Sequence, residues 1–130
     1  MQDRPNVLEL LGAVQSFLAE DVVPALDGRR RFLALVSANV LAIVARELTG
    51  EEERTLEEWR RLATLLSLDG EPPPRIEQLR NAVGEQTRVL AERIRNGDAD
   101  GGPWVEAVRA HVRQTVIEKL RVANPRYLGA

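Results

Sequence analysis

Apolar residues recur at every third or fourth position along almost the whole chain, and no stretch alternates apolar and polar residues with a period of two. A spacing of three and four places side chains on one face of an α-helix, whereas a half-buried strand needs the period of two. The sequence therefore predicts an all-α protein.

The pattern divides into five helices joined by short loops. The first helix begins at Asn6, and Glu9 is placed to complete a capping box. Turn residues mark the other boundaries. The later helices are expected at about 29–48, 51–66, 74–96 and from 103 onward. The residues expected to face the core are Val7, Leu10, Leu11, Val14, Phe17, Leu18, Leu56, Trp59, Leu62, Ala63, Leu66, Ile76, Leu79, Val83, Leu90, Ile94, Val105, Val108, Val112, Val116 and Leu120, with Thr87 in the one polar slot.

The helix at about 29–48 differs from the others because it is apolar nearly all round from Phe32 to Ala45. Such a helix is typically buried on most sides. We therefore predict an up-and-down bundle of about five helices packed around this central apolar helix. The length favours a single domain over residues 1–130, with residues 123–130 as a C-terminal docking segment.

Composition narrows the classes of partner and compartment. The formal net charge of −2 argues against nucleic acid or an anionic membrane as the main partner. The chain has no cysteine, which excludes disulfides and thiolate chemistry. The N-terminal stretch lacks the layout of a signal peptide, and the longest apolar run contains Ser37 and Asn39 and is too short to span a bilayer. A cytoplasmic location is the resulting expectation.

Catalytic and cofactor-binding motifs are not recognisable in the sequence. The one histidine, His111, falls at the edge of an apolar face, and we interpret it as a surface or boundary residue without a catalytic role. No glycine-rich loop follows a strand or ends in Gly-Lys-Ser/Thr, so no nucleotide site is predicted. We predict no catalytic residue, no cofactor and no metal.

An acidic cluster leaves one enzymatic alternative open. Its members are Glu47, Glu51, Glu52, Glu53, Glu57 and Glu58. Repeated Glu-x-x-Glu patterns hold Mg²⁺ in all-α nucleotide pyrophosphohydrolases. Here the glutamates alternate with arginines at helical spacing, and a solvated face with i,i+4 ion pairs is the favoured interpretation.

Three polar features exceed what a simple core needs. Asn39 lies in the most apolar helix, where a buried amide requires a hydrogen-bond partner; structural pairing is favoured, and a partner-facing role is the alternative. The run Arg29 to Arg31 stands at a helix N-terminus, where the dipole disfavours cations. Arg126 and Tyr127 follow Pro125 and are residue types enriched in interface hot spots, although Tyr127 packing back onto its own bundle is an equal alternative.

Three stretches, LLGAVQSFLAEDVVPAL, GRRRFLALVSANVLAIVAREL and TVIEKLRVANPRY, resemble a widespread bacterial family of small all-helical proteins of unknown function. The middle of the chain, residues 50–102, is generic. The matched positions are Phe32, Asn39, Ile43, Val44, Arg46, Glu47, Leu48, Lys119, Leu120, Asn124, Pro125, Arg126 and Tyr127. The chain departs from the family pattern at Leu33, Leu35 and Ala123.

Members of this family occur alongside an aminoglycoside-phosphotransferase-like kinase and acyl-CoA dehydrogenases. The resemblance implies a non-catalytic companion subunit of a kinase that phosphorylates hydroxyacyl-CoA in fatty- or oxo-acid catabolism, with the kinase supplying the catalytic groups. The predicted partner-binding residues are Asn124, Pro125, Arg126, Tyr127, Asn39 and Arg46. The alternatives are a stand-alone metal-dependent phosphohydrolase and a self-associating bundle, for instance a homodimer.

Overall fold

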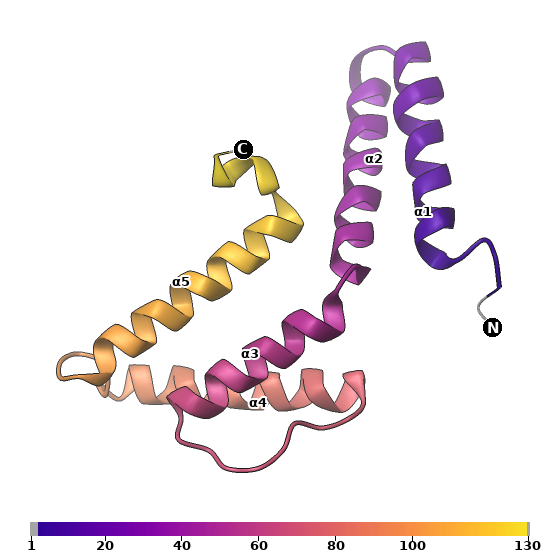
Figure 1. The fold of residues 1–130 in the computed structure, drawn as a ribbon. Coiled ribbons are helices and arrows are strands. Elements are labelled where there is room, and N and C mark those ends of the chain that lie inside the picture. The colour runs from indigo at the N-terminus through magenta and orange to yellow at the C-terminus, as the bar shows by residue number, and fades with distance from the viewer. Residues whose placement is uncertain (1–2, 130) are drawn as a thin grey trace. The chain divides into compact units, whose positions relative to one another are not determined.

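The computed structural model describes residues 3–129 and contains five α-helices and no strand within them (Figure 1). The all-α prediction is confirmed. The helices are α1 (Val7–Ser16), α2 (Gly28–Leu48), α3 (Glu51–Leu65), α4 (Ile76–Arg95) and α5 (Trp104–Ala123). A π-helical stretch, η1 (Phe17–Val22), and a 3-10 turn, η2 (Val23–Ala25), extend α1, and a second 3-10 turn, η3 (Pro125–Leu128), follows α5.

The chain divides into two compact units. Among the described residues, one consists of residues 3–50 with Val122–Asn124, and the other of Glu51–Arg121 with residues 125–129. The prediction of a single domain, with a docking segment at 123–130, stays a prediction. Each unit is described by itself below.

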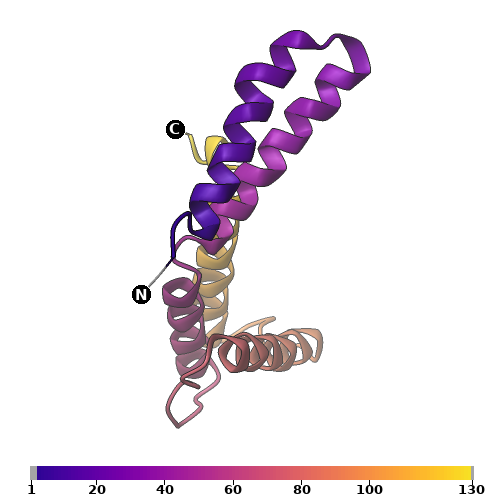
Figure 2. The same cartoon turned by 90° about the vertical axis from the view of Figure 1, so that its right-hand side faces the viewer.

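The first unit is a helical hairpin in which α1 and α2 run antiparallel side by side (Figures 1 and 2). Asn6 is the N-cap of α1 as predicted: its side-chain Oδ1 accepts a hydrogen bond from the backbone N–H of Glu9 at 2.9 Å. The predicted capping box is only half formed, because the Glu9 carboxylate meets the Asn6 side-chain amide at 3.4 Å.

The predicted burial of α2 on most sides is wrong for this chain. Among its residues only Ala34 and Ala38 are buried, and these small side chains allow a neighbouring helix to approach closely. Most of the large apolar side chains of α2 are exposed. The prediction that the apolar stripe of α1 faces a core is also wrong, because Val7, Leu10 and Val14 are exposed.

The buried core lies in the second unit instead. Leu62 and Leu65 of α3, with Leu66 directly after it, meet Leu90 of α4 and Val108 of α5. Leu62 is completely buried, as its position on the predicted apolar face of α3 requires. The buried polar residue on the apolar face of α4 is Gln86, whereas Thr87 is exposed. The prediction that Thr87 is the polar residue on this face is therefore wrong by one position.

The buried face of α5 also differs from the prediction. Val112 and Val116 are about half exposed, whereas Val108 and His111 are buried. Trp104 sets this orientation: its indole Nε1 donates to the Leu65 carbonyl at 2.9 Å, and the Arg93 guanidinium stacks 4.0 Å from the centre of its ring. The start of α5 is therefore tied to the end of α3.

Two helices of this unit end in the same backbone motif. At the end of α4, Asp98 N–H donates to the Arg93 carbonyl and Gly97 N–H to the Ile94 carbonyl, with Gly97 in the left-handed region at φ +92°. This is a Schellman cap, in which glycine is the usual residue. At the end of α3 the equivalent left-handed position is held by Ser67, at φ +54°.

No single helix within residues 3–129 is long and apolar enough to cross a membrane. Only α2 and α3 taken together, across the bend between them, have the length and apolar composition that a membrane span requires.

Candidate functional site

An open cavity of about 870 Å³ lies between α3 and α5 in the second unit. Its lining includes apolar side chains from both helices together with several hydrogen-bonding groups. The lining residues used below are Arg60, Arg61, Leu65, Trp104, His111, Gln114 and Glu118. A concave, mostly apolar wall with a few polar groups is the usual form of a small-molecule site.

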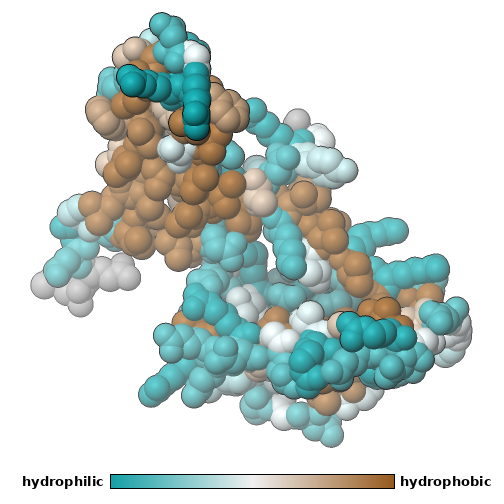
Figure 3. Space-filling model, turned by 180° about the vertical axis from the view of Figure 1, so that it is seen from behind, coloured by the Kyte–Doolittle hydropathy of each residue, from teal (hydrophilic) through white to brown (hydrophobic). Residues whose placement is uncertain are grey.

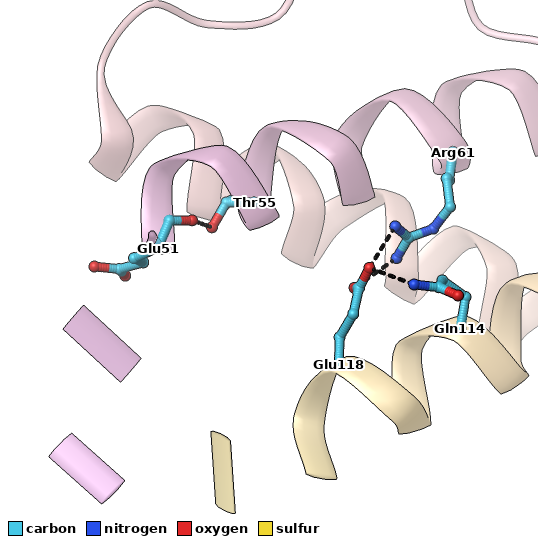
Figure 4. Close-up of polar contacts among 5 residues, drawn as sticks. All are labelled: Glu51, Thr55, Arg61, Gln114 and Glu118. Atoms are coloured by element: carbon cyan, nitrogen blue, oxygen red, sulfur yellow. Dashed lines mark hydrogen bonds and ion pairs between the residues drawn. The ribbon is translucent and has the colours of Figure 1, made fainter. Parts of the chain in front are cut away.

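A two-pronged ion pair joins the walls of the cavity. Arg61 of α3 donates from Nη1 and Nη2 to the two carboxylate oxygens of Glu118 on α5, each at 2.9 Å. Gln114 of α5 donates its side-chain amide to the same carboxylate at 2.9 Å. Figure 4 shows the side chains of Arg61 and Gln114 converging on the Glu118 carboxylate. This bidentate geometry is specific to arginine, since lysine cannot present two parallel donors.

The network sets the protonation of Glu118. Burial by itself raises the pKa of this carboxyl, but the hydrogen bonds from Arg61 and Gln114 and the charges of Arg61 and Arg121 outweigh burial, so the pKa lies below its ordinary value. Glu118 is therefore ionised at neutral pH and neutralises Arg61. Nearby, burial raises the pKa of Glu58 against the opposing charge of Arg61.

His111 lies on the same wall and is buried, so its interpretation as a surface or boundary residue is wrong. Burial and, secondly, the positive charge of Arg61 lower the pKa of its imidazole, against the opposing charge of Glu118. The ring is therefore neutral at pH 7. Its Nδ1 has no hydrogen-bond partner among residues 3–129, and the same holds for Nε of Arg61 and the hydroxyl of Thr115.

These groups define what the cavity can do chemically. A neutral imidazole offers one donor and one acceptor, and the Arg61 Nε–H adds a further donor. Leu65 and Trp104 provide apolar surface beside them. The arrangement fits a ligand with an apolar body and a hydrogen-bonding end.

Sequence reasoning missed this cavity for an identifiable reason. The prediction took Val112 and Val116 as part of the buried face of α5. In the structure the residues one position earlier, His111 and Thr115, are the more buried ones. A signal was present, because Trp104, His111, Thr115 and Glu118 are themselves spaced as one helical face. Polar side chains on that face made it less apolar than the alternative.

The predicted partner-binding residues are distributed over both units. In the first unit Asn39 is exposed, so its interpretation as a buried amide paired within the bundle is wrong, and the partner-facing alternative stays a prediction. Asn124 is exposed as well. In the second unit Arg126 and Tyr127 are exposed on η3 and Pro125 is half-buried. Tyr127, at 74% exposure, does not pack back onto its own bundle.

Arg46 has a role inside the first unit. Its Nε donates to the Val122 carbonyl at 2.7 Å, within the last turn of α5. Carbonyls in the last turn of a helix lack intrahelical partners, and a cation there complements the helix dipole. This bond gives Arg46 a structural function that the sequence did not indicate.

The acidic cluster of α3 does not gather into a metal site. No group of three or more histidine, aspartate or glutamate side chains that could hold a metal is present among the described residues. The Glu51 carboxylate accepts a hydrogen bond from Arg80 Nε at 2.6 Å, and its backbone carbonyl accepts from the Thr55 hydroxyl at 2.7 Å (Figure 4). The ion pair of Glu51 therefore joins α3 to α4, and Arg61 likewise pairs with Glu118 of α5, whereas the prediction placed these pairs at i,i+4 within α3.

Comparison with known proteins identifies a family and no individual relative. The chain matches no curated protein and no solved structure. Residues 24–127 match the family described as "Domain of unknown function (DUF6285)", which covers α2 through Tyr127 and so includes the cavity and the Asn-Pro-Arg-Tyr segment. The chain therefore belongs to the DUF6285 family.

Proposed function

We propose that this chain is a non-catalytic accessory subunit of an aminoglycoside-phosphotransferase-like kinase that acts on hydroxyacyl-CoA in fatty- or oxo-acid catabolism. The observation that carries the proposal is the exposure of Tyr127 on η3, next to exposed Arg126. At 74% exposure the fold covers little of the Tyr127 side chain, and tyrosine and arginine are preferred anchors in interfaces. A cytoplasmic location belongs to the same proposal.

The family match supports the choice of this segment, because the matched region extends through Tyr127. The identity of the partner rests on the resemblance to proteins found beside such kinases. In that arrangement the kinase supplies the phosphate-binding loop, the catalytic base and the Mg²⁺ ligands. The small subunit supplies a docking surface.

The test is reconstitution of the purified chain with a phosphotransferase-like kinase from the same genome. Complex formation and phosphorylation of hydroxyacyl-CoA are measured for the kinase alone, with the wild-type chain and with Arg126→Ala or Tyr127→Ala. We expect the wild-type chain to bind and to raise kinase activity. Each substitution should weaken binding by at least about 10-fold, as hot-spot truncations do.

Arg109→Ala provides the matched control, since Arg109 is an exposed arginine whose ion pair with Glu106 is also exposed. It should bind the kinase like the wild type. Thermal unfolding of each variant checks that the fold is kept. No complex at micromolar concentrations, or equal binding by Tyr127→Ala and the wild type, would refute the proposed role of this segment.

A second candidate function is the binding of a small amphipathic molecule in the cavity between α3 and α5. The observation that favours it is the buried His111 imidazole, with an unpartnered Nδ1 on a largely apolar wall. Titration of medium-chain carboxylic acids, amides and alcohols, followed by the His111 ring resonances in NMR, tests this function. Saturable shifts that vanish in Ala107→Trp, which fills the cavity, are expected; unchanged resonances with every probe would exclude it.

A further inference from the structure

The α1–α2 hairpin exposes an unusual amount of apolar surface. Ten large apolar side chains on α1, η1 and α2 are between 39 and 57% exposed. Leu35 and Val36 lie off the row that the other four residues of α2 form by helical spacing. We call the remaining eight residues the hairpin face: Val7, Leu10, Val14, Phe17, Leu33, Val40, Val44 and Leu48. Figure 3 shows an extended hydrophobic surface over this part of the molecule.

The spacing of these residues follows the rule of helices that pack on helices. Along α1 and η1 the exposed positions advance in steps of three and four, from Val7 to Phe17. Along α2 they advance from Leu33 to Leu48 at heptad-compatible spacing, with Ser37 in the intervening position. A repeat of three and four is the pattern of side chains that insert between those of a facing helix.

The hairpin face is distinct from the contact within the hairpin. In α2 that inner contact uses the buried small residues Ala34 and Ala38. The large side chains are therefore left for another surface. Viewed along two antiparallel helices, the α1 positions Leu10 and Val14 and the α2 positions Val40 and Val44 fall on the same side of the pair. Together they form one continuous apolar strip.

The apolar area of the hairpin face matches the largest patches on monomeric proteins, which are often functional. Complete burial of a leucine or valine side chain removes on the order of 100 Å² from water, so eight half-exposed side chains offer about 400 Å² per chain. An apolar patch of this size on a monomer usually marks an interaction site. Two such patches and their polar rims together approach the size of a stable interface.

We propose that the occupant of the hairpin face is the hairpin of a second copy of this chain, so that two hairpins form an antiparallel four-helix bundle. Two adjacent helices that each carry a three-and-four seam are half of such a bundle. A two-fold axis brings the same patch together from both copies. The eight residues of the face carry no charge, so self-pairing meets no like-charge repulsion at the centre.

The ends of α2 favour the antiparallel orientation. The basic run Arg29 to Arg31 lies at its first turn, whereas its last turn carries Arg46 and Glu47, whose charges cancel. An antiparallel copy sets the basic run of one α2 beside the last turn of its partner's α2, which has no net charge. A parallel copy would set the two basic runs against each other. The distribution of charge along α2 therefore favours the antiparallel pair.

The mass of the full chain in solution tests this proposal. We expect sedimentation equilibrium to give twice the chain mass of 14.5 kDa at micromolar concentrations. Val40→Glu places a carboxylate in the seam of each copy and should weaken dimerisation at least 100-fold. Val116→Glu is the matched control: Val116 of α5 is exposed to the same 49% as Val40 and lies outside the hairpin face.

A second measurement covers the case in which Val40→Glu prevents folding. Because the chain has no cysteine, Val40→Cys introduces a single thiol. A bis-maleimide that spans the about 8–10 Å between packed helices should link two Val40→Cys chains and leave Val116→Cys unlinked. A monomeric wild type, equal cross-linking of both variants, or equal weakening by Val40→Glu and Val116→Glu would each overturn the proposal.

The outcome is independent of the proposed kinase partner, because both measurements use the purified chain alone. Arg126→Ala and Tyr127→Ala should dimerise like the wild type. Loss of dimerisation in those variants would contradict the assignment of the interface to the hairpin face. Binding of a kinase by a monomeric chain would likewise overturn the dimer proposal and leave the proposed function standing.

Discussion

Arg61 and Glu118 meet across the cavity through two hydrogen bonds of 2.9 Å, although 57 residues separate them in the sequence. Both side chains are largely shielded from solvent, at 26 and 13% exposure. Shielding increases the strength of the pair and also the penalty for leaving one member without the other. The pair links α3 to α5 beside His111.

Glu118→Ala should therefore lower the free energy of unfolding by about 2–3 kcal/mol, because the Arg61 guanidinium loses its charged partner. Arg61→Leu combined with Glu118→Leu should cost less than the sum of the two single substitutions. Urea denaturation of the wild type, Arg61→Leu, Glu118→Leu and the double variant measures this coupling. Glu106→Ala, which removes an exposed pair with Arg109, should change stability by less than about 0.5 kcal/mol. Additive single effects would contradict the coupling.

The pH dependence of Glu118 has a definite sign. Its pKa in the folded protein lies below the ordinary value of 4.5, so its contribution to stability is complete above that value and is lost as the pH falls through the folded pKa. Urea denaturation below pH 4.5 should show a loss of stability in the wild type that is smaller in Glu118→Gln. An identical acid slope in both proteins would contradict the assignment.

His111 should titrate below the ordinary histidine pKa of 6.5, because burial and then the Arg61 charge disfavour the imidazolium. Between the folded pKa and 6.5 the unfolded chain binds more protons than the folded one, so stability rises with pH in this window. It is lost again on acidification. The chain has one histidine, and a single set of ring resonances therefore reports its titration in NMR.

His111→Gln supplies the control for that measurement. It removes the titrating group, and the slope of stability against pH in the same window should decrease in urea denaturation. A folded-state His111 pKa at or above 6.5, or an unchanged slope in His111→Gln, would show that the imidazole is hydrated and not buried.

Leu62→Ala should be among the most destabilising single changes, with a loss of about 2–5 kcal/mol, because Leu62 is completely buried at the meeting point of α3, α4 and α5. Leu68→Ala is the matched control, since Leu68 follows α3 and is about half exposed. Its effect should stay below about 1 kcal/mol. Comparable losses for the two variants in urea denaturation would place the core elsewhere.

Ser67 and Gly97 hold equivalent left-handed positions after α3 and α4, and substitutions there should act in opposite directions. Ser67→Gly relieves a conformation that costs a residue with a Cβ about 1–2 kcal/mol, and we expect a net gain of about 0.5–1 kcal/mol after the entropy of glycine is counted. Gly97→Ala should destabilise, because its Cβ would also lie 3.2 Å from the Asp100 carboxylate. Thermal unfolding distinguishes these signs; a loss in Ser67→Gly would contradict the strain.

Local structure was predictable where a single residue decides it. Asn6 caps α1 because its side chain can reach the backbone N–H of Glu9, and that depends only on neighbours in sequence. Gly50 ends α2 with a positive φ for the same kind of local reason. The end of α5 at Ala123 followed from Pro125, because an α-helix does not continue easily through proline.

The candidate cavity was not predictable in this way. Arg61, His111 and Glu118 are brought together by packing between helices that are far apart in sequence. Periodicity shows that α5 has an apolar side, but two overlapping faces satisfy it. The more apolar one, with Val112 and Val116, was the wrong choice because the Trp104 hydrogen bond to Leu65 rotates the other face toward α3.

The sequence by itself determined that the chain is helical, where most helices begin and end, and that α2 is apolar nearly all round. These properties depend on φ and ψ preferences, caps and spacing within a few residues. Only the tertiary structure decided which apolar faces are covered. Leu62 and Val40 are equally suited to a core, yet one is buried and the other half exposed, because burial depends on which helix packs opposite.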